Sequence, residues 1–324
     1  MIQGKKILIT GGAGFIGSHM AERLAPTNDV TLLDVELDGP IKYTALASDE
    51  KVRKIEGDVC NADQIEDEVA NCQVLLHFAS ILGVQKVIDH ARPTMDTILQ
   101  GTRNVMDAAS RNKNIERIVN ISTSEVYGNI MSAEEGTAPA SVGTGNDARL
   151  CYAAAKLMGE HIVWAYHRDF KLPTVIVRPF NIYGDRRVGA HASGVFTVKA
   201  LAGTDVTLHG DGSQLRSWCH IDDFCDAITA CIEKDEAIGQ DFNIGTPVTA
   251  TTIYDLAQRI IRLCESTSNL TTTPYTFSDI GVRAPNSSRA RELLGYEPSI
   301  DLDAGLLKTI PWYREHLDEF PHWL

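Results

Sequence analysis

The sequence lacks the features that mark several large classes of protein. Of its 324 residues, 30 are Lys or Arg and 43 are Asp or Glu, which gives a formal net charge of −13. General nucleic-acid binding depends on clustered Lys and Arg that attract phosphates, so this composition argues against it. An acidic chain can still bind an anionic ligand where a few arginines converge.

The chain also lacks the patterns of disulfide, zinc-binding and membrane proteins. Its 7 cysteines contain no CxxC pair and lie mostly in apolar stretches, which predicts buried free thiols in a reducing compartment and no metal site. No apolar run is long enough to span a bilayer, and the opening MIQGKKILIT has no apolar signal core. We therefore expect a cytoplasmic protein with neither a membrane nor a nucleic-acid partner.

Short β-branched runs alternate with longer helical patterns over the first two-thirds of the chain. This alternation predicts an α/β fold, in which helices cover both faces of a doubly wound parallel sheet. Strands are predicted over Lys6–Thr10, Val30–Asp34, Val52–Glu56, Val74–Phe78, Arg117–Ile121, Thr174–Arg178 and Asp241–Ile244, and helices over Phe15–Leu24, Ala62–Val69, Thr94–Arg111, Tyr152–Phe170 and Asp222–Glu233. Beyond Asn181 the pattern loosens, and the tail Ser287–Trp323 holds two further helical patterns.

A glycine-rich turn follows the first predicted strand and opens the first predicted helix. Gly11, Gly14 and Gly17 give the spacing GxxGxxG. Such a backbone can turn tightly and approach a pyrophosphate at the N-terminus of the helix. A tight strand-to-helix turn without a ligand is the alternative, but the position between strand and helix favours a Rossmann-type dinucleotide site.

Two aspartates follow later strands of the same sheet. Asp34 ends the second strand, where a carboxylate can accept hydrogen bonds from the adenosine ribose and would repel a 2′-phosphate. No Arg follows it closely, so NAD is the expected cofactor. Asp58, after the third strand, is a weaker candidate for contact with the adenine, because Asp after Gly is also common in plain turns.

Tyr152 and Lys156 form a Y-x-x-x-K pair on a predicted helix, so their side chains share one face. A nearby ammonium lowers the pKa of a phenol, which would make Tyr152 a usable base near neutral pH. Two unrelated surface residues are the alternative. The position of the pair downstream of a dinucleotide site favours the catalytic interpretation.

The motifs together resemble the extended short-chain dehydrogenases/reductases that modify nucleotide sugars. The resemblance covers nearly the whole chain and rests on GGAGFIG, HFAS (His77–Ser80), STSEVYG (Ser122–Gly128), YAAAK, RPFNIYG (Arg178–Gly184), GDGSQLRSW (Gly210–Trp218) and the late Arg-x-Pro (Arg283–Pro285). It implies a Rossmann-type NAD-binding domain over residues 1–180, re-entered around 220–250. An interleaved, smaller C-terminal α/β lobe over 181–324 would bind the nucleotide sugar.

The resemblance also implies roles for individual residues. Tyr152 would take the proton of the sugar 4-hydroxyl during C4 oxidation, Lys156 would hold the nicotinamide ribose, and Thr123 would bond the same hydroxyl. Asn181 would contact the substrate near its diphosphate, and Arg216 and Arg283 would clamp the diphosphate or nucleotide. Further cofactor contacts are implied at Phe15, Ile16, Val59, Phe78, Ala79 and Pro179.

Three points lie outside these assignments. Arg186 and Arg187 are as well explained by a solvated loop as by phosphate binding. The family often carries Asn three residues before the Gly-Thr of its fourth crossover helix, where this chain has Ile98, so one cofactor contact is in doubt. The resemblance further implies a homodimer built from the helices predicted over Thr94–Arg111 and Tyr152–Phe170, whose apolar faces a monomer core could equally use.

The branches of this family share a 4-keto sugar and differ in how that sugar then reacts. A 4,6-dehydratase usually carries Asp-Glu after its Thr, and here Ser124 and Glu125 follow Thr123, so the usual acid is missing. Thr-Ser-Glu, RSWC and the late Arg-x-Pro resemble UDP-glucuronate decarboxylases, in which Ser124 and Glu125 would assist ring distortion and reprotonation at C5. This reaction is favoured over 4-epimerisation and dehydration. A sensor or scaffold that binds NAD without catalysis is a minor alternative.

Overall fold

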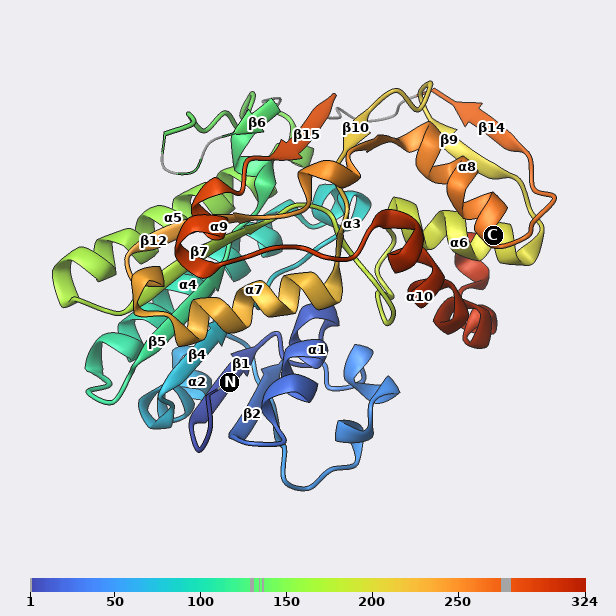
Figure 1. Ribbon diagram of the computed structural model, residues 1–324. Coiled ribbons are helices and arrows are strands. Elements are labelled where there is room, and N and C mark those ends of the chain that lie inside the picture. The colour runs from blue at the N-terminus through green and yellow to red at the C-terminus, as the bar shows by residue number, and fades with distance from the viewer. Residues whose placement is uncertain (1, 129–130, 134, 136, 275–280) are drawn as a thin grey trace.

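The computed structural model describes residues 2–128, 131–133, 135, 137–274 and 281–324. A parallel sheet of 7 strands runs through the molecule in the order β12-β7-β5-β4-β1-β2-β3 (Figure 1). Its strands are β1 (Lys6–Thr10), β2 (Asp29–Asp34), β3 (Arg53–Glu56), β4 (Val74–His77), β5 (Arg117–Ile121), β7 (Thr174–Pro179) and β12 (Gln240–Ile244). All seven predicted strands are present, and the predicted re-entry of Asp241–Ile244 is confirmed, because β12 pairs with β7 at the sheet edge.

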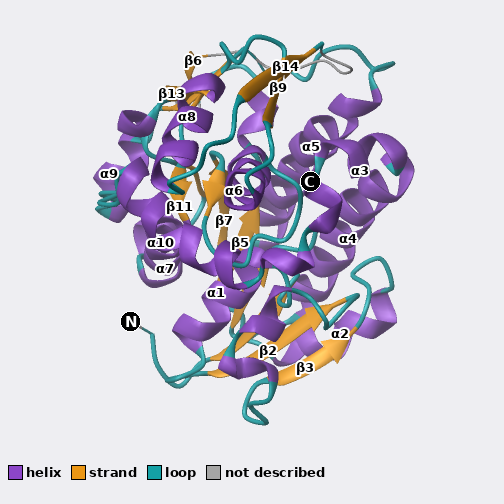
Figure 2. Cartoon of the chain, turned by 90° about the vertical axis from the view of Figure 1, so that its right-hand side faces the viewer, coloured by secondary structure: helices purple, strands orange, loops and turns teal. Residues whose placement is uncertain are grey.

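Helices cover both faces of this sheet, as the near-continuous apolar strands predicted. They are α1 (Phe15–Leu24), α2 (Ala62–Asn71), α4 (Ala91–Arg111), α5 (Cys151–Phe170), α7 (Ile221–Glu233) and α9 (Ser288–Leu294). The short helix α3 (Val84–Asp89) packs against α4. In Figure 2 the large sheet lies between α7 and α9 on one side and α4 and α5 on the other. Alternate residues of β1 point to opposite faces of the sheet. Ile7 and Ile9 pack with α1 and α7, whereas Leu8 packs with α2 and α4.

Local interactions determine where the helices begin. Helix α2 begins after Asn61, whose side chain accepts the N–H of Asp63. Helix α4 begins three residues before the predicted Thr94. Pro93 is tolerated in its first turn, because the N–H groups there have no partner within the helix and the missing N–H of proline costs no hydrogen bond. The long predicted helices are therefore confirmed, with differences at their ends only.

The rest of the described chain forms smaller sheets and three more α-helices, seen along the top and the right of Figure 1. A sheet of four strands has the order β13-β10-β15-β6, and two-stranded sheets join β11 with β8 and β14 with β9. These strands are β6 (Met131–Ala133), β8 (Ile182–Tyr183), β9 (Val206–His209), β10 (Leu215–Arg216), β11 (Cys219–His220), β13 (Thr251–Thr252), β14 (Leu270–Thr273) and β15 (Val282–Pro285). Helices α6 (Ala192–Ala202) and α8 (Ile253–Leu263) pack on β9, and α10 (Leu302–Glu315) packs on α6 and α8, with Leu208, Leu256 and Leu306 in their shared core.

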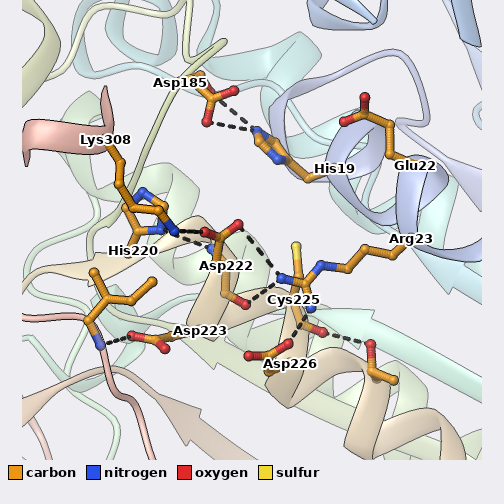
Figure 3. A network of polar contacts seen from close by, with 12 residues as sticks. His19, Glu22, Arg23, Asp185, His220, Asp222, Asp223, Cys225, Asp226 and Lys308 are labelled. Carbon is orange, nitrogen blue, oxygen red and sulfur yellow. Dashed lines mark hydrogen bonds and ion pairs between the residues drawn. The ribbon is translucent and has the colours of Figure 1, made fainter. Parts of the chain in front are cut away.

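A polar network centred on Asp222 ties the first helix to this part of the chain (Figure 3). Asp222 lies in the first turn of α7, where its N–H is capped by the His220 ring and its carboxylate meets Lys308 of α10 at 2.6 Å. Arg23 of α1 donates to the Asp222 carbonyl at 3.0 Å and also pairs with Asp226. The His220 hydrogen bond, followed by Lys308, holds the pKa of Asp222 well below its usual value.

All 7 cysteines are free thiols, as predicted. Within the described part of the chain, no helix is both long and apolar enough to cross a bilayer.

Candidate functional site

The glycine loop between β1 and α1 is packed against backbone on every side. A Cβ added to Gly17 would lie 2.3 Å from the carbonyl oxygen of Gly11, and one on Gly11 would lie 2.8 Å from the Ala79 nitrogen. Gly11 also has a φ of +70°, a backbone conformation that residues with a side chain rarely adopt. These contacts explain why Gly11 and Gly17 are needed, and they place Phe78 and Ala79 beside the loop.

The N-terminus of α1 has the properties of a phosphate site. Gly14 caps this helix without a side-chain hydrogen bond, and its first turn contains no acidic residue. Beside the loop, the Asp34 carboxylate accepts the Ala13 N–H at 3.1 Å. Burial raises the pKa of Asp34, and hydrogen bonds from backbone N–H groups oppose that shift. Free backbone donors next to a strand-end carboxylate fit a dinucleotide with an unmodified ribose.

The turn after β3 is fixed by a residue that the sequence did not single out. Asn104 of α4 donates to the carbonyls of Val59 and Cys60, both at 2.9 Å, and the Asp58 carboxylate accepts the Cys60 N–H at 2.8 Å. A Cβ on Gly101 would lie 2.5 Å from Val59, so the glycine lets α4 approach this turn. Asp58 and Val59 therefore keep their predicted place at the sheet end.

Ile98 marks the departure from the family pattern. It is buried in a small apolar cluster with Val87, Tyr152 and Ala155. An asparagine there would present an amide, whereas Ile98 packs against the predicted catalytic helix. The cofactor contact that an asparagine would make here therefore stays in doubt.

Tyr152 and Lys156 lie one turn apart on α5, and both are buried. The Lys156 ammonium donates to the Ile121 carbonyl at 2.7 Å and lies 6.0 Å from the centroid of the Tyr152 ring. Burial lowers the pKa of Lys156 to about 8, and Glu160 one turn further along the helix opposes that shift. The β5 end thus holds the lysine next to the tyrosine.

The pKa of Tyr152 moves in the opposite direction from the sequence-based prediction. In this chain burial raises it, the Glu125 carboxylate raises it further, and a hydrogen bond with Thr123 opposes both effects. The prediction considered only Lys156, whereas desolvation of the phenolate dominates at a buried position. The lowered pKa predicted from the Y-x-x-x-K spacing is therefore wrong for the chain by itself.

The STSEVYG segment brings three polar residues to the end of β5. Thr123 caps the short 3-10 helix Ser124–Tyr127 by accepting the Glu125 N–H at 3.2 Å, and its hydroxyl also bonds Tyr152. Ser124 is buried beside it. Tyr152 therefore contacts Thr123 and lies within reach of the charge of Glu125.

Arginines from three separate segments surround Glu125. Arg149 binds its carboxylate with both terminal nitrogens, at 2.6 and 3.1 Å, and Arg283 approaches to 3.4 Å. Burial alone would raise the pKa of Glu125, but Arg283, Arg149 and Arg216 hold it below its usual value. We call Glu125, Arg149, Arg283 and Arg216 the arginine cluster.

Sequence reasoning did not identify Arg149. It lies in the 3-10 helix Ala148–Leu150, directly before α5, and its N–H is capped by the Asp147 carboxylate. Its only signal in the sequence was its place three residues before Tyr152. That spacing gives no indication that the side chain turns toward Glu125.

Arg216 and Arg283 are paired in register on the parallel strands β10 and β15, so the two residues lie side by side. Both side chains are buried, and among the described residues the Arg283 Nε has no hydrogen-bond partner. Asn181 has a φ of 43° and donates its side-chain amide to the Ser217 carbonyl at 2.7 Å. The amide thus ties the end of β7 to the segment that carries Arg216.

Arg186 and Arg187 do not lie in a solvated loop. Arg186 is 5% exposed and pairs with Glu22 of α1 at 2.6 Å. The Arg187 guanidinium lies 5.5 Å from the centroid of the Phe15 ring in the glycine loop, and burial lowers its pKa. Both arginines bind the N-terminal helix, so the solvated-loop alternative is wrong for them.

A second buried network supports the site from within the sheet. Arg178 of β7 donates to both carboxylate oxygens of Glu160 on α5, at 2.8 and 2.6 Å, and to the Tyr127 hydroxyl at 2.6 Å. Ser122 and Asp241 complete this network. Removal of one member would leave a buried charge without its partner, which is strongly destabilising.

Known proteins resemble this chain over nearly its whole length. A UDP-N-acetyl-alpha-D-glucosaminuronate decarboxylase of Bacillus cytotoxicus is 33% identical, with 96% of this chain and 98% of that protein covered. A dTDP-glucose 4,6-dehydratase of an Actinoplanes species is 32% identical, covering 95% of this chain and 98% of that one. The solved UDP-glucuronic acid 4-epimerase of Bacillus cereus, in complex with UDP-glucuronic acid and NAD, superposes with a TM-score of 0.86 at 27% identity, covering 96% and 99% of the two chains.

These three proteins are named for three different reactions: a decarboxylation, a dehydration and an epimerisation. The similarities therefore indicate the family and do not identify the reaction of this chain. The family model of the NAD dependent epimerase/dehydratase family matches residues 7–245, which contain the glycine loop, Thr123, Tyr152 and Lys156. The chain belongs to the NAD-dependent epimerase/dehydratase family, and NAD is its cofactor.

Proposed function

We propose that this protein is an NAD-dependent UDP-uronate decarboxylase, acting on UDP-glucuronate or its 2-acetamido counterpart. The arginine cluster carries the proposal. Three arginines surround one carboxylate beside Tyr152, so a positive charge remains where the sugar would react. A uronate carboxylate at C6 would compensate that charge, whereas the neutral hydroxymethyl group of UDP-glucose would not.

The proposed reaction begins at the sugar 4-hydroxyl. Tyr152 accepts its proton, and Thr123 bonds the same oxygen and orients it. Bound NAD supplies the hydride acceptor for C4. Lys156 holds the nicotinamide ribose, and Asn181, Arg216 and Arg283 hold the substrate at or near its diphosphate and carboxylate.

Oxidation at C4 turns a uronate into a β-keto acid, which loses CO2 without a metal or another strong catalyst. Arg283 lies near the carboxylate or its protonation path, and Glu125 and Ser124 assist ring distortion and reprotonation at C5. Because Arg283, Arg149 and Arg216 keep Glu125 ionised, it assists through charge and orientation and is not itself the proton donor to C5. A dehydratase would need an acid at the position of Ser124, which offers only a hydroxyl.

The proposal extends to the organisation of the chain. Residues 1–180, re-entered around 220–250, would bind NAD, and 181–324 would bind the nucleotide sugar. We propose a cytoplasmic homodimer built on α4 and α5, a pairing supported by the exposed apolar side chains of Met158 and Phe170 on α5.

The test is to incubate the purified protein and NAD with UDP-glucuronate and, separately, with UDP-N-acetylglucosaminuronate. Products are identified by mass spectrometry and proton NMR. We expect loss of CO2. A product of unchanged mass would make the protein a 4-epimerase of uronates, which the same positive charge would serve and which needs no further acid or base. Tight NAD binding without turnover of these or of neutral UDP- and dTDP-sugars would favour a sensor or scaffold.

A further inference from the structure

The ion pair between Arg149 and Glu125 is almost completely enclosed. The exposed fractions of the two side chains are 7% and 15%, and both terminal nitrogens of Arg149 face the carboxylate. A two-point pair of this kind fixes orientation as well as charge, which a single lysine contact would not. The pair therefore holds Glu125 in one position beside Tyr152.

Arg149 and Glu125 are linked to Tyr152 by short stretches of backbone, and their charges also act on it directly. The 3-10 helix that carries Arg149 runs directly into α5, and Tyr152 is the second residue of that helix. Glu125 follows Thr123, whose hydroxyl bonds Tyr152. Glu125 disfavours the tyrosinate, whereas Arg283 and Arg149 favour it.

We propose that Arg149 is a positioning residue for the proton transfer at Tyr152. It fixes Glu125 as an oriented carboxylate and balances its charge, so that the tyrosine hydroxyl can lose its proton. This inference rests on the proposed role of Tyr152 in C4 oxidation, which decarboxylase, epimerase and dehydratase share. It does not depend on which product forms.

Other charged groups also act on Tyr152, and they remain in the chain when Arg149 is changed. Lys156 lies on the same helix, Arg283 comes from β15, and Arg187 comes from the segment after β8. A change in pH dependence that appears only when Arg149 or Glu125 is altered is therefore due to their pair.

The experiment follows NADH absorbance in a single turnover as a function of pH, with whichever UDP-sugar the wild-type protein oxidises. We expect Arg149→Gln to move the acid limb of the rate profile to higher pH by about one unit, because a nearby positive charge is lost. Glu125→Gln should move it to lower pH, and the double variant should return it toward the wild-type position. Arg149→Lys should keep the limb in place with a reduced rate.

Arg262, whose side chain is 63% exposed on α8, provides the matched control as Arg262→Gln, and NAD binding by each variant checks folding. Lower rates with an unmoved profile, or a shift in the same direction in both single variants, would overturn the proposal. Release of an epimer in place of CO2 would overturn the decarboxylase assignment and leave this inference intact.

A second measurement tests the pair without turnover, so it applies even if no nucleotide sugar reacts. Carbon-13 NMR of glutamate-labelled protein can follow the Glu125 carboxyl, assigned by its loss in Glu125→Gln. We expect it to titrate at higher pH in Arg149→Gln than in the wild type. An unchanged titration would contradict the proposed role of Arg149.

Discussion

The glycine loop and the arginine cluster present different chemistry to their ligands. The glycine loop presents backbone, since added side chains at Gly11 and Gly17 would lie within 3 Å of main-chain atoms. The arginine cluster presents charged side chains brought from three distant segments. A backbone surface recognises what all family members share, whereas a charged surface can be changed residue by residue to select a substrate. The cofactor is accordingly common to the family and the reaction is not.

The largest expected effect is one that abolishes the chemical step and leaves cofactor binding by the glycine loop intact. We expect Tyr152→Phe to reduce C4 oxidation by about 10³-fold, in the range expected for loss of an acid–base group. NAD affinity should stay within a factor of about two to three, because the glycine loop is untouched. Single-turnover NADH formation and calorimetric NAD binding measure the two quantities. Retained oxidation would rule out Tyr152 as the base.

Arg283→Ala should affect only the region of the arginine cluster. Loss of this buried cation should reduce kcat/KM for the nucleotide sugar by about 100-fold, since a partner of a buried ion pair is removed. NAD affinity should hardly change. Steady-state kinetics with calorimetry of NAD binding provide the comparison, and equal losses in both would indicate misfolding.

Gly17→Ala should affect the backbone region instead. The added Cβ would meet the Gly11 carbonyl oxygen at 2.3 Å, so the loop must shift. We expect NAD affinity to fall about tenfold or more, with a loss of about 1–3 kcal/mol in unfolding free energy, as is typical of overpacking. Gly145→Ala is the control, because no atom lies within 4 Å of its added Cβ. Unchanged NAD binding in Gly17→Ala would show that the loop does not depend on its glycines.

The smallest effect concerns the polar network centred on Asp222, which connects α1 and α7 with α10. Because the folded-state pKa of Asp222 is depressed, its ion pairs stabilise the fold above the unfolded-state pKa of about 3.9, and this contribution is lost as the pH falls. Asp222→Asn should cost about 1 kcal/mol near neutral pH, a modest value because the side chain is 38% exposed. The cost should shrink as the pH falls below 4. Urea unfolding at several pH values measures it, and a pH-independent difference would contradict this account.

Features set by neighbouring residues in the sequence could be predicted from it. The seven strands of the large sheet, the glycine loop and the Tyr152–Lys156 pair all follow from local periodicity and spacing. The position of Arg149 against Glu125 could not be predicted, because it depends on how a one-turn helix is oriented in space. The direction of the Tyr152 pKa shift was wrong for a related reason, since burial is a property of the whole fold.

The short strands of the smaller sheets were also not predicted. β10 and β13 have two residues each and exist only because partners from distant parts of the chain hold them. A strand of two residues is too short to show a hydrophobic periodicity, so no sequence pattern predicts it.

The edge strand β12 has a consequence for the order in which the protein can be made. Residues Gln240–Ile244 pair with Thr174–Pro179, so the sheet can be completed only after the ribosome has synthesised the whole intervening segment and β12 itself. Until then β7 presents an open edge of unpaired N–H and C=O groups, a template for aggregation. A fragment ended near residue 180 would keep that edge permanently exposed. We therefore expect such a fragment to require chaperones, and the complete sheet to form late in translation.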